Sequence, residues 1–114
     1  MITNNSCKKI TLVEALDRLP GPQAELSVSV FEHGSLVVKL YTPLGHDDQS
    51  PHSRDEIYVV ARGSGEFVGG GARQAFAPHD VLFAAAGVEH RFENFTDDFA
   101  VWVFFYGPEG GEVD

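Results

Sequence analysis

The sequence predicts an all-β fold, a sandwich or a barrel, with one short helix at its N-terminal end. Eight short apolar runs follow one another at regular spacing between residues 25 and 106. Glycine, proline, asparagine and aspartate separate these runs, as is typical of strands joined by tight turns. Because each such strand can bury a face only against another sheet, the pattern favours two packed sheets or a closed barrel.

The first predicted element is the short helix, which begins after Thr11. This threonine is a good N-cap, and Glu14 stands three residues later, where the acidic partner of a capping box is found. Residues 20–22 read Pro-Gly-Pro and end the helix. We expect residues 1–24 to form an N-terminal segment in which this helix covers the periphery of a single domain.

The strands that follow are expected to form one barrel over residues 25–108. Their predicted ranges are 25–31, 35–41, 56–61, 65–68, 72–76, 81–85, 90–95 and 99–106. His33 and His79 are interpreted as turn residues between strands, since each stands beside glycine, proline or aspartate. Residues 109–114 indicate a loose tail.

Two of the predicted strands, around residues 57–61 and 99–106, are apolar on both alternating faces. Each of them therefore needs cover on both sides. The inside of a barrel covers only one side. The outer side needs either the N-terminal segment, which would leave a monomer, or a second copy of the chain, and we expect a homodimer.

Charge and composition exclude several classes of partner. The chain has 114 residues, of which 17 are acidic and 8 basic, for a formal net charge of −9. Nucleic acids and anionic membranes are bound through clustered lysine and arginine, so neither is an expected partner. The one cysteine, Cys7, has no partner for an internal disulfide, and no stretch reaches the length of a membrane span. We expect a cytoplasmic protein whose partner is a small molecule.

The stretch HDDQSPHSRDE, residues 46–56, concentrates metal-ligand types just before a buried strand. Side chains of an extended segment alternate between two faces, so His52 and Glu56 lie on the same face. Histidine nitrogen and carboxylate oxygen together suit a borderline divalent cation. The neighbouring acids, Asp47, Asp48 and Asp55, are interpreted as a solvated rim beside the strand.

A second group of residues, with Gly87, His90 and Asn94, stands at the start of a later strand. At these positions the chain resembles a small single-domain cupin with the RmlC-like barrel. That family carries a first motif G-x5-H-x-H-x3/4-E-x6-G and a second motif G-x5-P-x-G-x2-H-x3-N. His52, Glu56 and Gly63 match the first motif, and the later group matches the second. The resemblance covers positions 44–94 and implies a jelly-roll barrel, the double-stranded β-helix of the cupins.

The resemblance also implies a metal site that faces the barrel interior. Carried over residue by residue, the family's ligands correspond to His52, Glu56 and His90, which would bind a divalent ion such as Fe, Mn, Ni or Zn. Ser50 stands where the family has its first histidine. Three other positions depart from the motifs: Gly45 is displaced by one residue, and His79 and Ala85 replace a glycine and a proline.

The serine leaves three arrangements open. Two histidines and one carboxylate can hold a metal alone and leave coordination positions open. Alternatively, another side chain of the same segment completes the ligand set, the candidates being His46, Asp48, Gln49 and Ser50. In the third arrangement the metal is lost, and the three residues form a hydrogen-bonded polar cluster.

Strand parity with Glu56 and His90 predicts an apolar pocket around the site. Its expected lining residues are Tyr58, Val60, Phe92 and either Trp102 or Phe104. Members of the resembled family include enzymes, of dioxygenase or isomerase type among others, and plain binding domains. Two functions therefore stay open: an enzyme acting on a small organic molecule, or a non-catalytic binding or sensor module, with or without metal.

Overall fold

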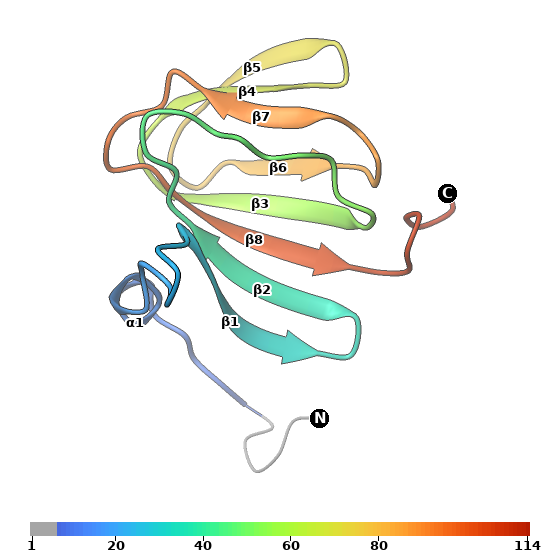
Figure 1. Ribbon diagram of the computed structural model, residues 1–114. Coiled ribbons are helices and arrows are strands. Elements are labelled where there is room, and N and C mark those ends of the chain that lie inside the picture. The colour runs from blue at the N-terminus through green and yellow to red at the C-terminus, as the bar shows by residue number, and fades with distance from the viewer. Residues whose placement is uncertain (1–6) are drawn as a thin grey trace.

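The computed structural model describes residues 7–114 and contains two antiparallel sheets in that part of the chain (Figure 1). One sheet has the strand order β1-β2-β8-β3-β6 and the other the order β5-β4-β7. The strands are β1 (Ser27–His33), β2 (Leu36–Tyr41), β3 (Asp55–Arg62), β4 (Gly65–Gly69), β5 (Ala72–Phe76), β6 (Val81–Ala84), β7 (His90–Glu93) and β8 (Ala100–Tyr106). The predicted all-β fold is thus confirmed, with the eight strands within a few residues of their expected ranges. The two sheets are not joined into a closed barrel.

The predicted short helix is also confirmed as α1 (Leu12–Asp17). Thr11 is its N-cap, and the Thr11 hydroxyl accepts a hydrogen bond from the Glu14 amide at 3.1 Å. Ala15 is the helix residue with no exposed surface, and it packs on the outer face of the larger sheet. The first six residues of the expected N-terminal segment 1–24 lie outside the described residues. Among those described, no helix has the length and apolar character needed to span a bilayer.

The main core lies between the two sheets and follows the alternation of the strands. On β3, Tyr58 and Val60 point into this core, and on β8 the same face carries Val101 and Val103. Across the core, Phe92 contributes from β7. The three predicted lining residues of β3 and β7 therefore do face the interior.

The prediction that Trp102 or Phe104 faces the interior is wrong. Both pack with the second cluster, on the outer face of the sheet beneath α1. The reason is register: Glu56 is paired with Phe105, so that the residues of β8 that share its face are the odd-numbered ones. Parity within one strand could not reveal this cross-strand pairing.

The outer face of the larger sheet is covered over part of its area by the N-terminal segment. Leu40 and Ala100 are buried there together with Ala15 of α1. Farther along the same face, on β6, Val81 and Phe83 remain 67% and 55% exposed. The predicted need for cover on both faces is therefore met within the chain near α1, whereas the β6 end stays open to solvent.

Several positions of the matched motifs, outside the predicted ligand set, have a left-handed backbone conformation. Gly63, Gly87 and Asn94 all have positive φ angles, of 86°, 79° and 52°. His79 adopts a φ of 76° in the turn before β6, where the family has glycine. Histidine tolerates this left-handed region better than most side chains, so the replacement keeps the turn.

The C-terminal segment, which the sequence indicated as loose, is tied to the start of β3. The Asp55 carboxylate accepts hydrogen bonds from the amides of Ala86 and Glu112, at 2.9 and 2.8 Å. The amide of Gly110 donates to the Ser53 carbonyl at 2.7 Å. The two bonds to its carboxylate hold the pKa of Asp55 below its usual value. Asp55 is therefore a buried structural anchor and not part of a solvated rim.

Candidate metal centre

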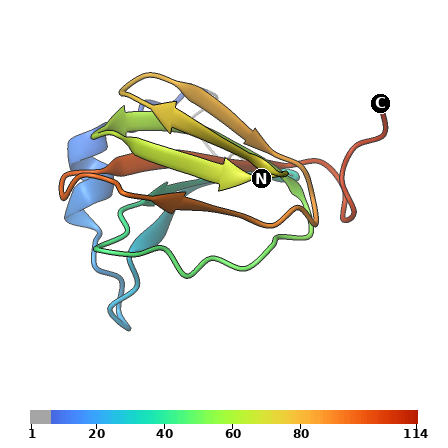
Figure 2. The same cartoon turned by 90° about the horizontal axis from the view of Figure 1, so that it is seen from above.

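The segment 42–54, called here the approach segment, runs beside β7 and leads into β3 (Figure 2). It contains no helix or strand, and the buried side chain of Asp47 holds its middle part against β2 and β7. The Asp47 carboxylate accepts hydrogen bonds from the Tyr41 hydroxyl at 2.5 Å, the Phe92 amide at 2.8 Å and the Gln49 side chain at 2.8 Å. Asp47 is buried, which corrects its interpretation as part of an exposed rim.

This anchor was missed because charge runs beside strands usually face water. A local signal does exist in the sequence Asp47-Asp48-Gln49. An aspartate often accepts the backbone amide two residues later, and here the Gln49 amide lies 3.3 Å from Asp47 Oδ1. Burial and the adjacent Asp47 carboxylate raise the pKa of Tyr41, so its hydroxyl stays a hydrogen-bond donor.

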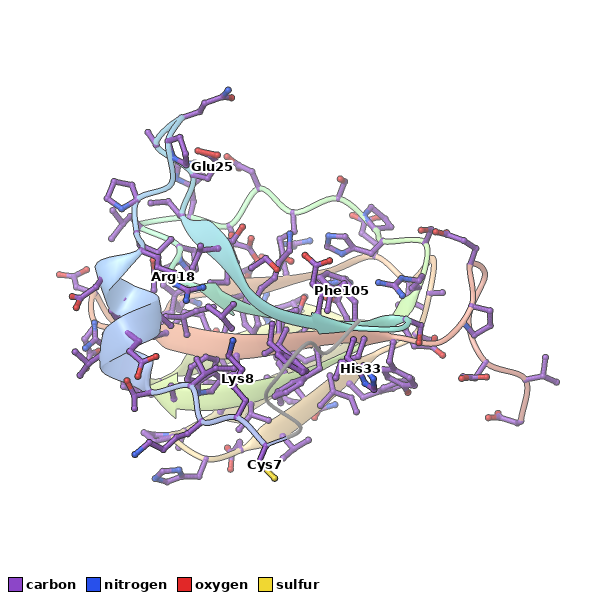
Figure 3. All side chains as sticks on the ribbon, turned by 90° about the horizontal axis from the view of Figure 1, so that it is seen from below. Cys7, Lys8, Arg18, Glu25, His33 and Phe105 are labelled. Atoms are coloured by element: carbon purple, nitrogen blue, oxygen red, sulfur yellow. The ribbon has the colours of Figure 1, made fainter. Side chains whose placement is uncertain are left out.

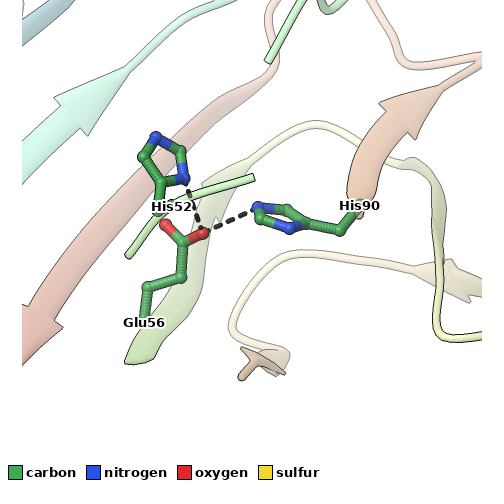
Figure 4. A group of neighbouring side chains, drawn as sticks. All are labelled: His52, Glu56 and His90. Atoms are coloured by element: carbon green, nitrogen blue, oxygen red, sulfur yellow. Dashed lines mark hydrogen bonds and ion pairs between the residues drawn. The ribbon is translucent and has the colours of Figure 1, made fainter. Parts of the chain in front are cut away.

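His52, Glu56 and His90 converge on one point at the end of the core (Figure 4). The approach segment carries His52, β3 carries Glu56, and His90 begins β7. Glu56 Oε1 lies 3.1 Å from His52 Nδ1 and 2.7 Å from His90 Nε2. Glu56 and His90 are almost completely buried, whereas the His52 side chain is 37% exposed and marks the side on which the site opens.

The ring of His90 is oriented by the backbone. Its Nδ1 lies 2.8 Å from the Val88 carbonyl, which can only accept, so Nδ1 carries a proton and Nε2 faces Glu56. Burial lowers the pKa of His90, but the bonds to Glu56 and to the Val88 carbonyl outweigh burial and raise it. Between the carboxylate and Nε2 there is thus a place for one cation, a proton or a metal ion.

Tyr58 and Gln49 extend this cluster toward the approach segment. The Tyr58 hydroxyl donates to Gln49 Oε1 at 3.1 Å and lies 2.9 Å from His90 Nε2. Burial and the negative charge of Glu56 raise the pKa of Tyr58 above its usual range. The hydroxyl is therefore neutral and held beside the three convergent side chains.

The other candidate metal ligands of the approach segment lie outside this convergent group. His46 and Asp48 bond to each other at 3.0 Å, and their side chains are 76% and 84% exposed. Ser50 is exposed as well. In the part of the chain that the structure describes, the convergent group of histidine, cysteine and acidic side chains consists of His52, Glu56 and His90. Of the additional candidates, Gln49 alone is linked to this group, through Tyr58.

The sequence of the chain also matches a known protein family. Residues 40–106, more than half of the chain, match the family model of the cupin domain. The chain belongs to the cupin family. The matched residues run from the end of β2 to the end of β8 and include the three convergent side chains.

Individual proteins and solved structures that are similar to this cupin were also found. An uncharacterized protein of Streptomyces coelicolor is 36% identical over 63 residues, which are 55% of this chain and 60% of that protein. The chain therefore matches less than two thirds of that relative's length. A protein of Neisseria meningitidis has a similar structure, with a TM-score of 0.68, 16% identity and coverage of 88% of this chain and all of that one. A cupin 2 conserved barrel domain protein of Salinispora arenicola gives a TM-score of 0.60 at 20% identity, covering 71% and 74% of the two chains. These two likenesses establish the fold.

The residues of this cupin fit a divalent metal ion. Glu56 Oε2 is buried and has no hydrogen-bond partner, an arrangement that costs free energy unless another group satisfies the oxygen. The three ligand atoms lie within 4.8 Å of one another. Neighbouring ligands of one tetrahedral ion with bonds of about 2.1 Å lie about 3.4 Å apart, and Glu56 Oε1 is already that near to both histidine nitrogens, so the remaining adjustment is a movement of the partly exposed His52 ring toward His90.

Proposed function

We propose that this cupin binds one divalent metal ion through His52 Nδ1, Glu56 and His90 Nε2, and that a small organic molecule binds at that ion. The observation that carries the proposal is the Glu56 carboxylate, whose Oε1 lies between two histidine nitrogens while its buried Oε2 has no hydrogen-bond partner. Two histidines and one carboxylate suit Fe, Mn, Ni or Zn. When bound, such an ion supplies a Lewis acid to an oxygen atom of the ligand.

Three groups of the protein act around the ion: the Glu56 carboxylate, the Val88 carbonyl and the Tyr58 hydroxyl. Glu56 contributes a negative charge at the centre of the site, and the Val88 carbonyl keeps Nε2 of His90 available by holding the proton on Nδ1. Such a second hydrogen bond to a ligand histidine fixes its tautomer and orientation. The neutral Tyr58 hydroxyl lies next to His90 Nε2, and by turning its one O–H away from Gln49 it can donate a hydrogen bond to an oxygen atom beside the ion.

An enzyme of the dioxygenase or isomerase type is the first form of this proposal. Three protein ligands leave coordination positions for substrate, as catalytic metal sites require. The site also opens beside half-exposed His52, which gives a small molecule a path to it. The second form is a sensor or binding module without turnover. Oxygen uptake and product formation with a panel of small acids, sugars and enols separate the two forms.

Metal content tests the proposal directly. Untagged protein should contain or take up about one equivalent of a divalent ion, measured by elemental analysis and by titration calorimetry. His90→Ala should reduce the affinity at least about a hundredfold, since it removes one of three ligands. His46→Ala is the matched control and should bind as the wild type does, because His46 lies outside the convergent group. Equal metal affinity in His90→Ala and wild type would contradict the proposed ligand set.

A further inference from the structure

A pocket of about 280 Å³ lies beside the candidate metal centre, on the inner face of β2 and β8. His52 forms one of its walls, and Phe105 and Val103 form its apolar floor. Lys39 of β2 and Gln49 of the approach segment supply polar groups. Figure 3 shows Phe105 on the side of the sheet that faces the approach segment, whereas Cys7 and Lys8 lie on the other side. The pocket is therefore continuous with the side on which the metal centre opens.

Lys39 is the cation of this pocket. It stands opposite Val103 in the β2–β8 register, so its side chain shares the inner face with that residue. The Lys39 ammonium lies 5.9 Å from the centroid of the Phe105 ring. The His52 ring contacts the same phenyl ring, with centroids 5.0 Å apart. A small molecule that lies across Phe105 can thus reach both the lysine and the metal centre.

Within residues 7–114, no carboxylate forms an ion pair with Lys39. Asp48 also borders the pocket, but its carboxylate is bonded to His46 and is largely exposed, so water screens its charge. Asp47 is occupied by its four hydrogen bonds. The lysine is therefore the charged group of the pocket that lacks a partner of opposite sign.

Charge balance gives the class of ligand. A divalent ion and the Glu56 carboxylate together leave one positive charge at the proposed centre, and Lys39 adds a second across the Phe105 ring. A molecule with an anionic oxygen at each end would neutralise both. Charge-assisted hydrogen bonds from an ammonium group to a carboxylate are among the stronger polar contacts in proteins. The apolar floor between the two charges suits a short aliphatic spacer.

We propose that the pocket binds a small dicarboxylic acid, with one end at the metal centre and the distal carboxylate on Lys39. The metal-binding end of this ligand rests on the proposed function, whereas the distal carboxylate rests on Lys39 alone. Lys39 is thus a specificity-determining residue that separates dicarboxylic acids from monocarboxylic acids of the same length.

A matched pair of probes tests this inference. 2-Hydroxyglutarate and 2-hydroxypentanoate have the same five carbons and the same hydroxy-acid end, but the second has a methyl group where the first has its distal carboxylate. We would measure the affinity for each by titration calorimetry, with metal-loaded and with metal-free protein. Wild type should bind the dicarboxylate at least about tenfold more tightly than the monocarboxylate, as expected for a hydrogen bond between charged groups.

Three variants assign the preference to Lys39. Lys39→Gln should remove it, while Lys39→Arg, which keeps the charge, should retain most of it. Lys9→Gln removes the same charge from an exposed residue that does not line the pocket and should leave the preference unchanged. Equal affinity for the two acids in wild type, no binding of either acid, or a preference that survives in Lys39→Gln would each overturn the inference.

Titration with the metal alone separates this inference from the proposed function. If the protein binds no metal but still prefers the dicarboxylate through Lys39, the Lys39 subsite stands and the metal centre is refuted. If it binds the metal and treats the two acids alike, the metal centre stands and the Lys39 subsite is refuted.

Discussion

Asp47 and Asp48 are neighbours in the sequence but differ in burial and in the hydrogen bonds that their carboxylates accept. Asp47 is buried and accepts four hydrogen bonds, of which those from the Tyr41 hydroxyl and the Phe92 amide join the approach segment to β2 and β7. Asp48 is exposed and bonds only its neighbour His46 among the described residues. Residue type could not distinguish the two, because the difference arises from the Phe92 amide, which is 45 residues away in the chain.

Replacement of these aspartates should therefore have unequal effects on stability. Asp47→Ala leaves the Phe92 amide and the Tyr41 hydroxyl without their acceptor in a buried place, and should lower the free energy of unfolding by about 2–4 kcal/mol. Asp48→Ala should change it by less than about 0.5 kcal/mol. Urea denaturation followed by circular dichroism measures both. Equal effects would mean that Asp47 does not anchor the segment.

At the scale of elements, the sequence predicted the strands well and their mutual register poorly. Alternation within β3 correctly predicted that Tyr58 and Val60 share the inner face with Glu56. The pairing of Glu56 with Phe105 depends on contacts between distant strands, and parity counted along one strand placed Trp102 and Phe104 on the wrong face. The proximity of His52, Glu56 and His90 was implied by the family resemblance, since spacing alone does not bring β7 next to β3.

Gly63 is not a predicted metal ligand, but the backbone conformation and the close packing at this position require glycine. It has a φ of 86°, and a Cβ there would lie 2.6 Å from Thr96 Oγ1 and 2.7 Å from the Phe99 Cα. Gly63→Ala should therefore combine backbone strain with overpacking and lower stability by at least about 3 kcal/mol. Gly70→Ala is the matched control, because its φ of 57° is also positive but no atom lies within 4 Å of the added Cβ. It should cost about 1 kcal/mol, as backbone strain alone does. Thermal unfolding of both variants checks the difference, and similar losses would contradict the steric explanation.

At the scale of the whole molecule, the outer face of the larger sheet has two different halves. The half near α1 is covered by the chain's own N-terminal segment. The other half carries Val81 and Phe83 on β6, next to Ile57 and Val59 of β3. Exposed apolar patches of this kind often mark protein interfaces. The homodimer and the cytoplasmic location stay predictions from the sequence, and the open half of this face is where we expect the dimer contact.

Solution mass tests the dimer. Light scattering should give the mass of two chains for the wild type, and Phe83→Glu should shift it to one chain, because a buried unpaired charge is unfavourable at an interface. Val13→Glu, on the exposed side of α1, places the same charge outside this half and should leave the mass unchanged. A wild-type mass of one chain would exclude the dimer.

The bond between Asp47 and the Phe92 amide also has a consequence for how the protein moves. His52 belongs to the approach segment and its carbonyl also accepts a hydrogen bond from the Gly87 amide, so detachment of the whole segment would separate His52 from Glu56 and expose the Phe92 and Gly87 amides to solvent. Amide hydrogen exchange reports such local opening. Matching exchange rates of two backbone protons, at Phe92 and Gly87, therefore report how often the whole approach segment, with His52, leaves the candidate metal centre.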